Sequence, residues 1–490
     1  MQTHNPRQRR SAVSTVSPVL SLDLTDDESP RVIVPASTRR KQTKPLSASR
    51  PVAVDLFAGA GGMSLGFEQA GFDVVAAVEI DPVHALVHRF NFPHCAVLPQ
   101  SVVGLTGDAI RVAAELGKRK VAVVCGGAPC QGFSLIGKRV LDDPRNALVR
   151  EFLRIVVELD APYFVFENVR GITLGEHRRV LDELVEAFEA AGYDVRSPWR
   201  VLNASEYGVP QDRERLFLLG AKRGHALPKY PDPTTTPADL LDLYAHLPVG
   251  PTCRDALDDL PDADGFDTLI ESDAVRTTRW GEPSAYARTM RCDSEGGWLN
   301  GYAREWDAGV LTSSTRTHHT EISQRRFAAT PQGSVEPISR FFKLPANGIA
   351  NTLRAGTDGS RGAFTSPRPI HYAHPRCVTV REMARLHGFP DWFRLHATKW
   401  HGARQIGNAV PPPLARVVAG AVAEALGVRP SHPHKAMNLG DPKWLNVTVT
   451  EAAEILGVAA PSMRRDQRSG ATKRSQAETE AERLSRLKRR

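Results

Sequence analysis

The chain of 490 residues lacks any apolar run of the roughly 18 residues that a membrane-spanning helix needs. Residues 1–20 contain no continuous apolar segment and no cleavage site of the kind that a secretory signal carries. Cysteine is scarce: the chain has six, with no Cys-x-x-Cys pair and no Cys/His cluster of zinc-finger spacing. These absences predict a protein that is neither membrane-bound nor secreted, holds no metal ion, and keeps its thiols reduced in the cytoplasm.

Acidic residues are too few to balance the basic ones. Lys and Arg number 63 against 55 Asp and Glu, which leaves a formal net charge of +8. A basic balance favours a nucleic-acid partner, because neutralisation of phosphates by Lys and Arg dominates that kind of binding. Charge alone does not decide the matter, since many basic proteins bind no nucleic acid.

Hydrophobic periodicity is absent from residues 1–48, which are rich in Ser, Thr, Pro and Arg and predict a disordered tail. From residue 49 to about 222, short apolar runs alternate with amphipathic stretches. This alternation predicts an α/β fold with a doubly wound, mostly parallel, Rossmann-like sheet. Strands are expected at residues 52–57, 74–80, 121–127, 163–169 and 215–221, and helices at residues 64–71, 84–91, 147–159 and 178–192.

The alternating pattern stops between about 224 and 370, where Pro and Gly rise and no helix period is visible. This stretch predicts a separate, smaller, loop-rich lobe. The helix period returns at residues 378–389, so we expect the chain to re-enter the first domain. The predicted boundaries are 49–261 and 371–428 for the two parts of the first domain, 262–370 for the lobe, and 429–490 for a linker and last module.

A glycine-rich turn at residues 55–62 follows the first expected strand and opens a helix. Gly59 and Gly61 would let the backbone turn tightly and approach a ligand. Glu79 ends the next expected strand and could accept hydrogen bonds from ribose hydroxyls, and Asp108 could accept one from an adenine amino group. A nicotinamide dinucleotide site shares this logic, and a purely structural glycine turn is a further alternative.

A second turn, Gly126–Ser134, follows the 121–127 strand and contains Cys130. Ligands collect at the carboxyl ends of strands in a doubly wound sheet, so Cys130 would face the same crevice as the glycine turn. Pro129 stiffens the turn, and a following loop with Lys138, Arg139 and Arg145 would favour the thiolate. Cys130 is therefore a candidate nucleophile, whereas Cys125, within the apolar strand, suits the core.

Eight motifs follow one another along the chain. They are DLFAGAGG (55–62), Glu79, Asp108, GGAPCQGFS (126–134), Glu167-Asn168-Val169, QDRER (211–215), RDALDDLP (254–261) and GNAVPPP (407–413). In this order, they resemble the motifs of the cytosine-5 DNA methyltransferase family. The resemblance covers roughly residues 50–425, although the middle lobe matches only in position.

The resemblance implies that the enzyme transfers a methyl group from S-adenosylmethionine to carbon 5 of a cytosine flipped out of double-stranded DNA. Cys130 would add to carbon 6, and Glu167 would supply a proton or hydrogen bond at N3. Arg215 would hold the cytosine O2, and Arg213, on the same face of an extended segment, would help to order the site. Asn168 is expected to hold the turn in place rather than to take part in the reaction. Residues 131–148 could close over the flipped base.

The resemblance also implies a pocket for S-adenosylmethionine. Phe57 would pack on the adenine, Glu79 would bind the ribose, and Asp108 would bind the adenine amino group, with Leu148 and Asn408 completing the wall. The expected cofactor residues are Phe57, Gly59, Gly61, Glu79, Ile80, Asp108, Ala109, Pro129, Leu148 and Asn408.

The lobe at 262–370 would be the target-recognition domain, because its Arg- and Thr-rich phrases suit contacts with phosphates and guanines. We expect a monomer in the bacterial cytoplasm, on the nucleoid, as the modification enzyme beside a cognate restriction endonuclease. Two alternatives are a tRNA cytosine-5 methyltransferase and a DNA-binding regulator that keeps a methyltransferase core.

Residues 447–470 resemble the first part of a helix-turn-helix module. Ala453, Gly457 and Met463 fall where such a module needs a small residue, a turn glycine and a core hydrophobe. Basic residues, Arg464, Arg465 and Arg468, follow on the expected second helix. The alternative is an amphipathic helix that ends in a solvated basic tail.

Overall fold

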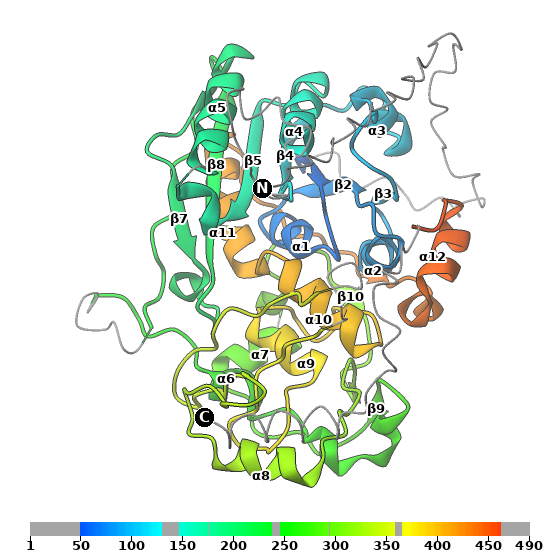
Figure 1. Cartoon of the computed structure of the whole chain (residues 1–490). Coiled ribbons are helices and arrows are strands. Elements are labelled where there is room, and N and C mark those ends of the chain that lie inside the picture. Colours follow the sequence, from blue (N-terminus) through cyan, green and yellow to red (C-terminus); the bar gives the residue numbers. More distant parts are fainter. Residues whose placement is uncertain are drawn as a thin grey trace, which may run out of the picture. The chain divides into compact units, whose positions relative to one another are not determined.

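The computed structural model describes residues 50–129, 147–175, 177–237, 246–293, 295–357 and 365–461 (Figure 1). An eight-stranded sheet forms the centre of the first domain. Its strands are β1 (Val52–Leu56), β2 (Asp73–Val78), β3 (Ala96–Leu98), β4 (Val121–Gly126), β5 (Tyr163–Val169), β6 (Tyr193–Val195), β7 (Arg200–Asn203) and β8 (Glu214–Lys222).

The strand order is β3-β2-β1-β4-β5-β8-β6, with β7 also paired to β8. The strands from β3 to β5 are parallel, while β8 runs antiparallel to β5, β6 and β7. The predicted doubly wound, mostly parallel sheet is confirmed. All five expected strands are present, as β1, β2, β4, β5 and β8. The three that were not predicted have three or four residues, too few to display a hydrophobic pattern.

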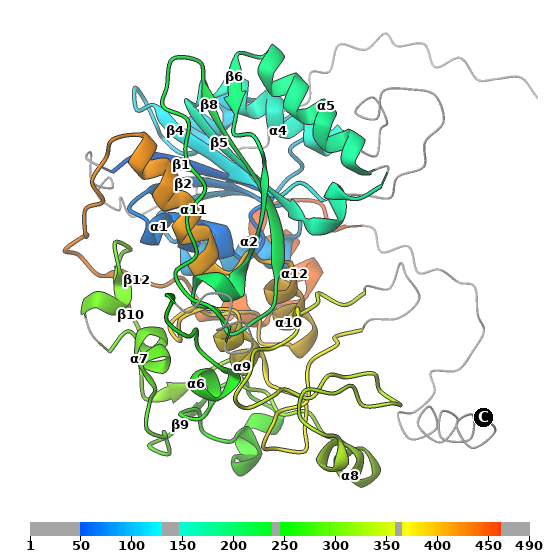
Figure 2. The ribbon, with the colours of Figure 1, turned by 90° about the vertical axis from the view of Figure 1, so that its left-hand side faces the viewer.

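Helices cover both faces of this sheet, as Figure 2 shows. One face packs against α1 (Gly62–Gln69), α2 (Pro82–Asn91) and α11 (Pro412–Ala425) in one apolar cluster. A second cluster joins the other face to three helices. These are α3 (Gly107–Ala113), α4 (Ala147–Glu158) and α5 (His177–Ala190).

The order of the sheet reverses between β1 and β4, and this reversal places the candidate motifs side by side. Leu56 is in register with Gly126, and Gly126 with Phe166, so β1, β4 and β5 end at the same edge. Parallel sheets bind ligands in the crevice outside such a switch point. The glycine turn and the segment that leads to Cys130 therefore leave the sheet as neighbours.

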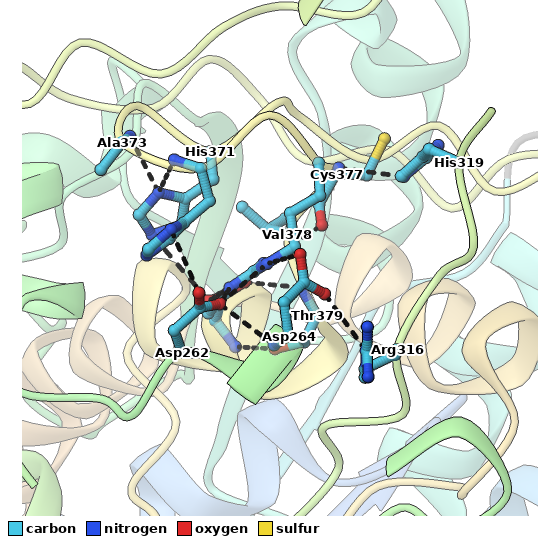
Figure 3. Close-up of polar contacts among 12 residues, drawn as sticks. Asp262, Asp264, Arg316, His319, His371, Ala373, Cys377, Val378 and Thr379 are labelled. Atoms are coloured by element: carbon cyan, nitrogen blue, oxygen red, sulfur yellow. Dashed lines mark hydrogen bonds and ion pairs between the residues drawn. The ribbon is translucent and has the colours of Figure 1, made fainter. Parts of the chain in front are cut away.

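The second lobe contains short helices and one two-stranded sheet, in which β9 (Val275–Arg276) pairs with β11 (Val310–Leu311). Ion pairs tie its start to the returning chain: Arg376 contacts both carboxylate oxygens of Glu382 at 2.8 Å and one oxygen of Asp262 at 3.0 Å. Figure 3 shows Asp262 and Asp264 in this cluster, and Arg316 lies 3.3 Å from Asp264. The helices within the lobe are α7 (Ala285–Arg291) and α8 (Glu321–Ala329), and those that flank it in sequence are α6 (Cys253–Leu257), α9 (Val380–Leu386) and α10 (Lys399–Asn408).

Segments distant in sequence cross between the lobe and the first domain. The Tyr302 hydroxyl donates to Asp73 at 2.8 Å, and Arg304 pairs with Glu68 at 2.8 Å, so part of the 262–370 range packs against the first domain. Arg385 of α9 pairs with Asp259 beside α6 at 3.1 Å, which joins the two parts of the first domain on either side of the lobe. The domain boundaries read from the sequence stay a prediction.

The C-terminal segment packs on the outside of α2. Its strand β12 (Met437–Asn438) pairs with β10 (Arg304–Glu305), and α12 (Val449–Leu456) buries Ala452 and Leu456 against α2. Gly457 ends α12 with φ 69°. Met463, Arg464, Arg465 and Arg468 lie outside the described residues, as does the tail 1–48, so the helix-turn-helix stays a prediction. No helix among the described residues is long and apolar enough to cross a membrane.

Helix α11 packs closely against α1 at Gly66, where there is no room for a side chain. A Cβ at Gly66 of α1 would lie 2.4 Å from Ala415 Cβ and 2.7 Å from the Pro412 carbonyl oxygen. We predict that Gly66→Ala lowers the free energy of unfolding by about 1–3 kcal/mol, because the helices must separate. Gly420→Ala is the matched control within α11, where nothing lies within 4 Å, and should gain about 0.5–1 kcal/mol. Denaturant unfolding measures both, and equal effects would contradict this packing.

Candidate active site

The glycine turn after β1 adopts a backbone that few side chains tolerate. Gly59 has φ 55° and Gly61 has φ 105°, and a Cβ at Gly61 would lie 2.4 Å from the Phe92 ring. Phe57 also has a positive φ, 60°, although it carries a side chain. Such strain persists where the surrounding structure enforces it and is frequent at ligand sites.

Glu79 holds this turn from the end of β2. Its carboxylate accepts a hydrogen bond from the Gly59 amide at 2.8 Å and one from the Asp81 amide at 2.8 Å. Burial raises the pKa of Glu79, although His84 and the two amides lower it. The next residue, Ile80, lies in the turn after β2, and its side chain is 65% exposed, whereas the large apolar side chains of β2 itself are buried. A buried acceptor beside an exposed apolar side chain fits a ligand with ribose hydroxyls and a flat base.

The remaining expected cofactor residues lie on three other elements. Asp108 is exposed in the first turn of α3, and Ala109 beside it is partly buried. Leu148 is partly buried near the start of α4, and Asn408 is exposed at the end of α10. The turn after Asn408 reaches the cofactor side, because a Cβ at Gly62 would lie 2.4 Å from the Val410 carbonyl oxygen.

The second turn also depends on close backbone approach. A Cβ at Gly126 would lie 2.3 Å from the Leu56 carbonyl oxygen, and one at Gly127 would lie 2.3 Å from Glu167 Oε2. Pro129 follows as an exposed residue. Cys130 lies outside the described residues, together with Lys138, Arg139 and Arg145 of the following loop.

Glu167 and Arg215 meet at the ends of β5 and β8. Arg215 Nε lies 2.9 Å from Glu167 Oε1, and both side chains are nearly buried. Burial raises the pKa of the Glu167 carboxyl, while Arg215 and Arg213 lower it. Asn168 Nδ2 donates to the Ala128 carbonyl at 3.0 Å, so the expectation that Asn168 fixes the turn is confirmed. A carboxyl that tends to keep its proton thus lies against the segment that leads to Cys130.

Arg213 is fully buried and binds backbone rather than a cavity. Its guanidinium donates to the carbonyls of Leu353 at 2.9 Å, Gly407 at 2.7 Å and Ala409 at 2.8 Å. These carbonyls come from the end of the lobe and from the GNAV turn. The role that the structure supports for Arg213 is to order the site, not to touch a substrate.

Residues 52–424 match the C-5 cytosine-specific DNA methylase family, which is 76% of the chain by length (373 of 490 residues). The chain belongs to this family. DNA cytosine-5 methylation, with S-adenosylmethionine as methyl donor, is therefore the activity of this methylase.

Relatives of this methylase are named as type II or DNA modification methyltransferases. The type II methyltransferase M.XorII of Xanthomonas oryzae pv. oryzae is 54% identical over 420 residues, which cover 86% of this chain and 96% of that protein. M1.HphI of Haemophilus parahaemolyticus is 32% identical over 75% of this chain and 86% of its own. A crystal structure assigned as a DNA modification methyltransferase of an E. coli prophage matches with a TM-score of 0.59 and 31% identity, over 77% of this chain and 99% of that one.

One buried pair that supports the methylase site has no signal in the sequence. Gln211 Nε2 lies 2.9 Å from His387 Nδ1, and His387 Nε2 lies 3.1 Å from the Ala409 carbonyl. Burial and the nearby Arg213 lower the pKa of His387, so its neutral ring donates to Ala409 and accepts from Gln211. Gln211 belongs to a recognised motif, but only the fold shows that His387 is its partner.

We predict that Arg213→Gln lowers the free energy of unfolding by about 3 kcal/mol or more, because three buried carbonyls lose a charged donor. Arg170→Gln is the matched control, since Arg170 makes an exposed ion pair with Glu214. It should leave the free energy of unfolding near that of the wild type. Urea denaturation with both variants measures the difference, and equal stabilities would refute the backbone clamp.

Proposed function

We propose that this methylase modifies a cytosine within a specific double-stranded DNA sequence, as the modification enzyme of a bacterial restriction-modification system. The single observation that supports the mechanism best is the contact of Glu167 with Arg215 beside the turn that leads to Cys130. The type II assignment of M.XorII supports the biological setting. A monomer in the cytoplasm, with a separate restriction endonuclease as partner of the system, is part of this proposal.

In the first step the Cys130 thiolate adds to carbon 6 of the extruded cytosine. The new sulfur–carbon bond drives the electrons of the 5,6 double bond toward carbon 5 and the N3–O2 side of the ring. Glu167 holds or delivers a proton at N3, and Arg215 donates to O2, so neither atom carries the charge alone. The 2.9 Å contact between the two side chains supports their action on N3 and O2, which are both bonded to carbon 2 of the ring.

S-adenosylmethionine supplies the methyl group that carbon 5 takes. Phe57 and the exposed Ile80 would pack on the adenine, Glu79 would accept the ribose hydroxyls, and Asp108 would accept the amino group. Solvent water then takes the proton from carbon 5, the electrons of that bond re-form the 5,6 double bond and expel the Cys130 thiolate, and N3 returns its proton to Glu167, which restores the aromatic ring. Gly59, Gly61, Ala109, Pro129, Leu148 and Asn408 would complete the pocket.

The lobe at 262–370 is proposed to read the target. Three arginines of its basic phrases already have carboxylate partners: Arg316 pairs with Asp264, Arg325 with Glu321 in an exposed pair, and Arg326 with Glu336. Arg354 is exposed and makes no ion pair with another described residue. It follows Leu353, whose carbonyl Arg213 holds, so it is the arginine of this lobe that we place on the DNA backbone.

The proton on Glu167 predicts a pH dependence. Burial raises its pKa above the ordinary value, so the active protonated form persists to higher pH and is lost as the pH rises through that pKa. Cys130 must instead lose its proton to act as a thiolate, and that form grows as the pH rises. A plot of kcat against pH should therefore be bell-shaped. Glu167→Gln should lower kcat by about 10²–10⁴-fold and remove the limb that belongs to Glu167. Methyl transfer to duplex DNA across pH measures both, and an unchanged limb would refute the assignment.

Bisulfite sequencing of a host that expresses the protein tests the proposed function. We expect methylated cytosines at one short recurring sequence, and none with Cys130→Ser, whose hydroxyl is a far weaker nucleophile. Parallel assays on purified tRNA should show no methyl transfer, which separates the tRNA alternative. Methylation that survives in Cys130→Ser, or that appears only on tRNA, would overturn the proposal. An inactive wild type would favour a regulator instead.

A further inference from the structure

A cavity of about 460 Å³ lies between the first domain and the lobe, away from the active site. The first domain contributes Tyr207 and, from the first turns of α11, Pro413 and Arg416. The lobe contributes Tyr286 and Met290 of α7. Neither the Glu167–Arg215 pair nor any expected cofactor residue lines it. The volume is in the range of sites for small molecules.

The wall of this cavity carries a cation without a counter-ion. The Nε atom of Arg416 is buried and has no hydrogen-bond partner, and no described carboxylate forms an ion pair with this guanidinium. Burial lowers the pKa of Arg416, and no neighbouring charge offsets that effect. Buried polar groups are nearly always satisfied, so such a group indicates a missing partner.

Among the described residues of the lining, the one carboxylate already has hydrogen-bond partners. Asp255 Oδ2 accepts hydrogen bonds from the Thr252 amide at 2.8 Å and from its hydroxyl at 2.6 Å, and so closes the start of α6. Tyr286 donates its hydroxyl to the Arg385 carbonyl at 2.5 Å. The rest of the wall is mixed: Met290, Pro413 and Val249 are apolar, and the polar side chains of Gln69, Thr234 and Thr289 lie among them.

We propose that this cavity binds a small organic anion, with a phosphate or carboxylate head on Arg416 and an apolar, flat body against Tyr286, Met290 and Pro413. A charge-assisted, bidentate contact would satisfy the guanidinium. Because walls come from both the first domain and the lobe, an occupant bridges them and stabilises the folded chain. The site is independent of the methylation mechanism, and its test reads binding alone.

Thermal unfolding in the presence of phenyl phosphate tests the site. Benzoate is the corresponding carboxylate probe, and phenol is the uncharged aromatic control. We expect a saturable rise of Tm for the wild type with one or both anions, and none with phenol. Arg416→Gln should weaken binding at least about tenfold, since a charged hydrogen bond is lost. Arg429→Gln is the control: Arg429 is exposed just after α11, outside the lining, and the substitution changes the charge equally.

A second variant separates loss of binding from loss of fold. Arg416→Met keeps the apolar stem and removes the unpaired charge, so without ligand it should be at least as stable as the wild type. An equal Tm rise in Arg416→Gln and wild type would overturn the proposal, because the anion then binds elsewhere. A marked loss of stability in Arg416→Met would also overturn it, because the guanidinium must then have a partner within the protein.

Discussion

The buried guanidinium of Arg213 is the interaction on which the site depends. Its three carbonyl partners lie 140, 194 and 196 residues further along the chain. It therefore joins the start of β8 to the end of the lobe and to the GNAV turn. Arg215, two residues later, reaches Glu167 from the same strand. One cation thus sets the distance between the carboxyl at the sheet edge and the segments that close the site.

Apolar burial and buried ion pairs hold the two parts of the protein together. The first domain buries apolar side chains on both faces of its sheet, which is the main source of stability in such folds. The lobe joins one of these clusters through Leu344 and Leu353, has two smaller clusters of its own, and is tied to the first domain by buried pairs such as Arg304–Glu68. Such pairs add little net stability, but breaking one is costly, so they fix one arrangement of the loops. A lobe of this kind can vary its exposed side chains while its frame persists.

The sequence was sufficient for the parts of the fold that leave a local pattern. β1, β2, β4, β5 and β8 are long apolar runs, and their ends place the glycine turn, Glu167 and the turn before Cys130 at one edge. It was insufficient where a contact joins distant segments. Nothing local marks His387 as the partner of Gln211, or Tyr302 as a donor to Asp73. The same limit applies to the Arg416 cavity, whose walls come from seven separate stretches of chain between Gln69 and Arg416.

Covalent trapping on DNA that contains 5-fluorocytosine at the target tests the mechanism most directly. The fluorine cannot leave as a proton does, so the adduct formed after methyl transfer cannot collapse. With S-adenosylmethionine present, the account predicts a denaturation-resistant protein–DNA complex whose cross-linked peptide contains Cys130. The Cys130→Ala variant should bind the same duplex without cross-linking. A cross-link at any other residue, or methylated product released from the fluorinated duplex without a trapped protein, would contradict it.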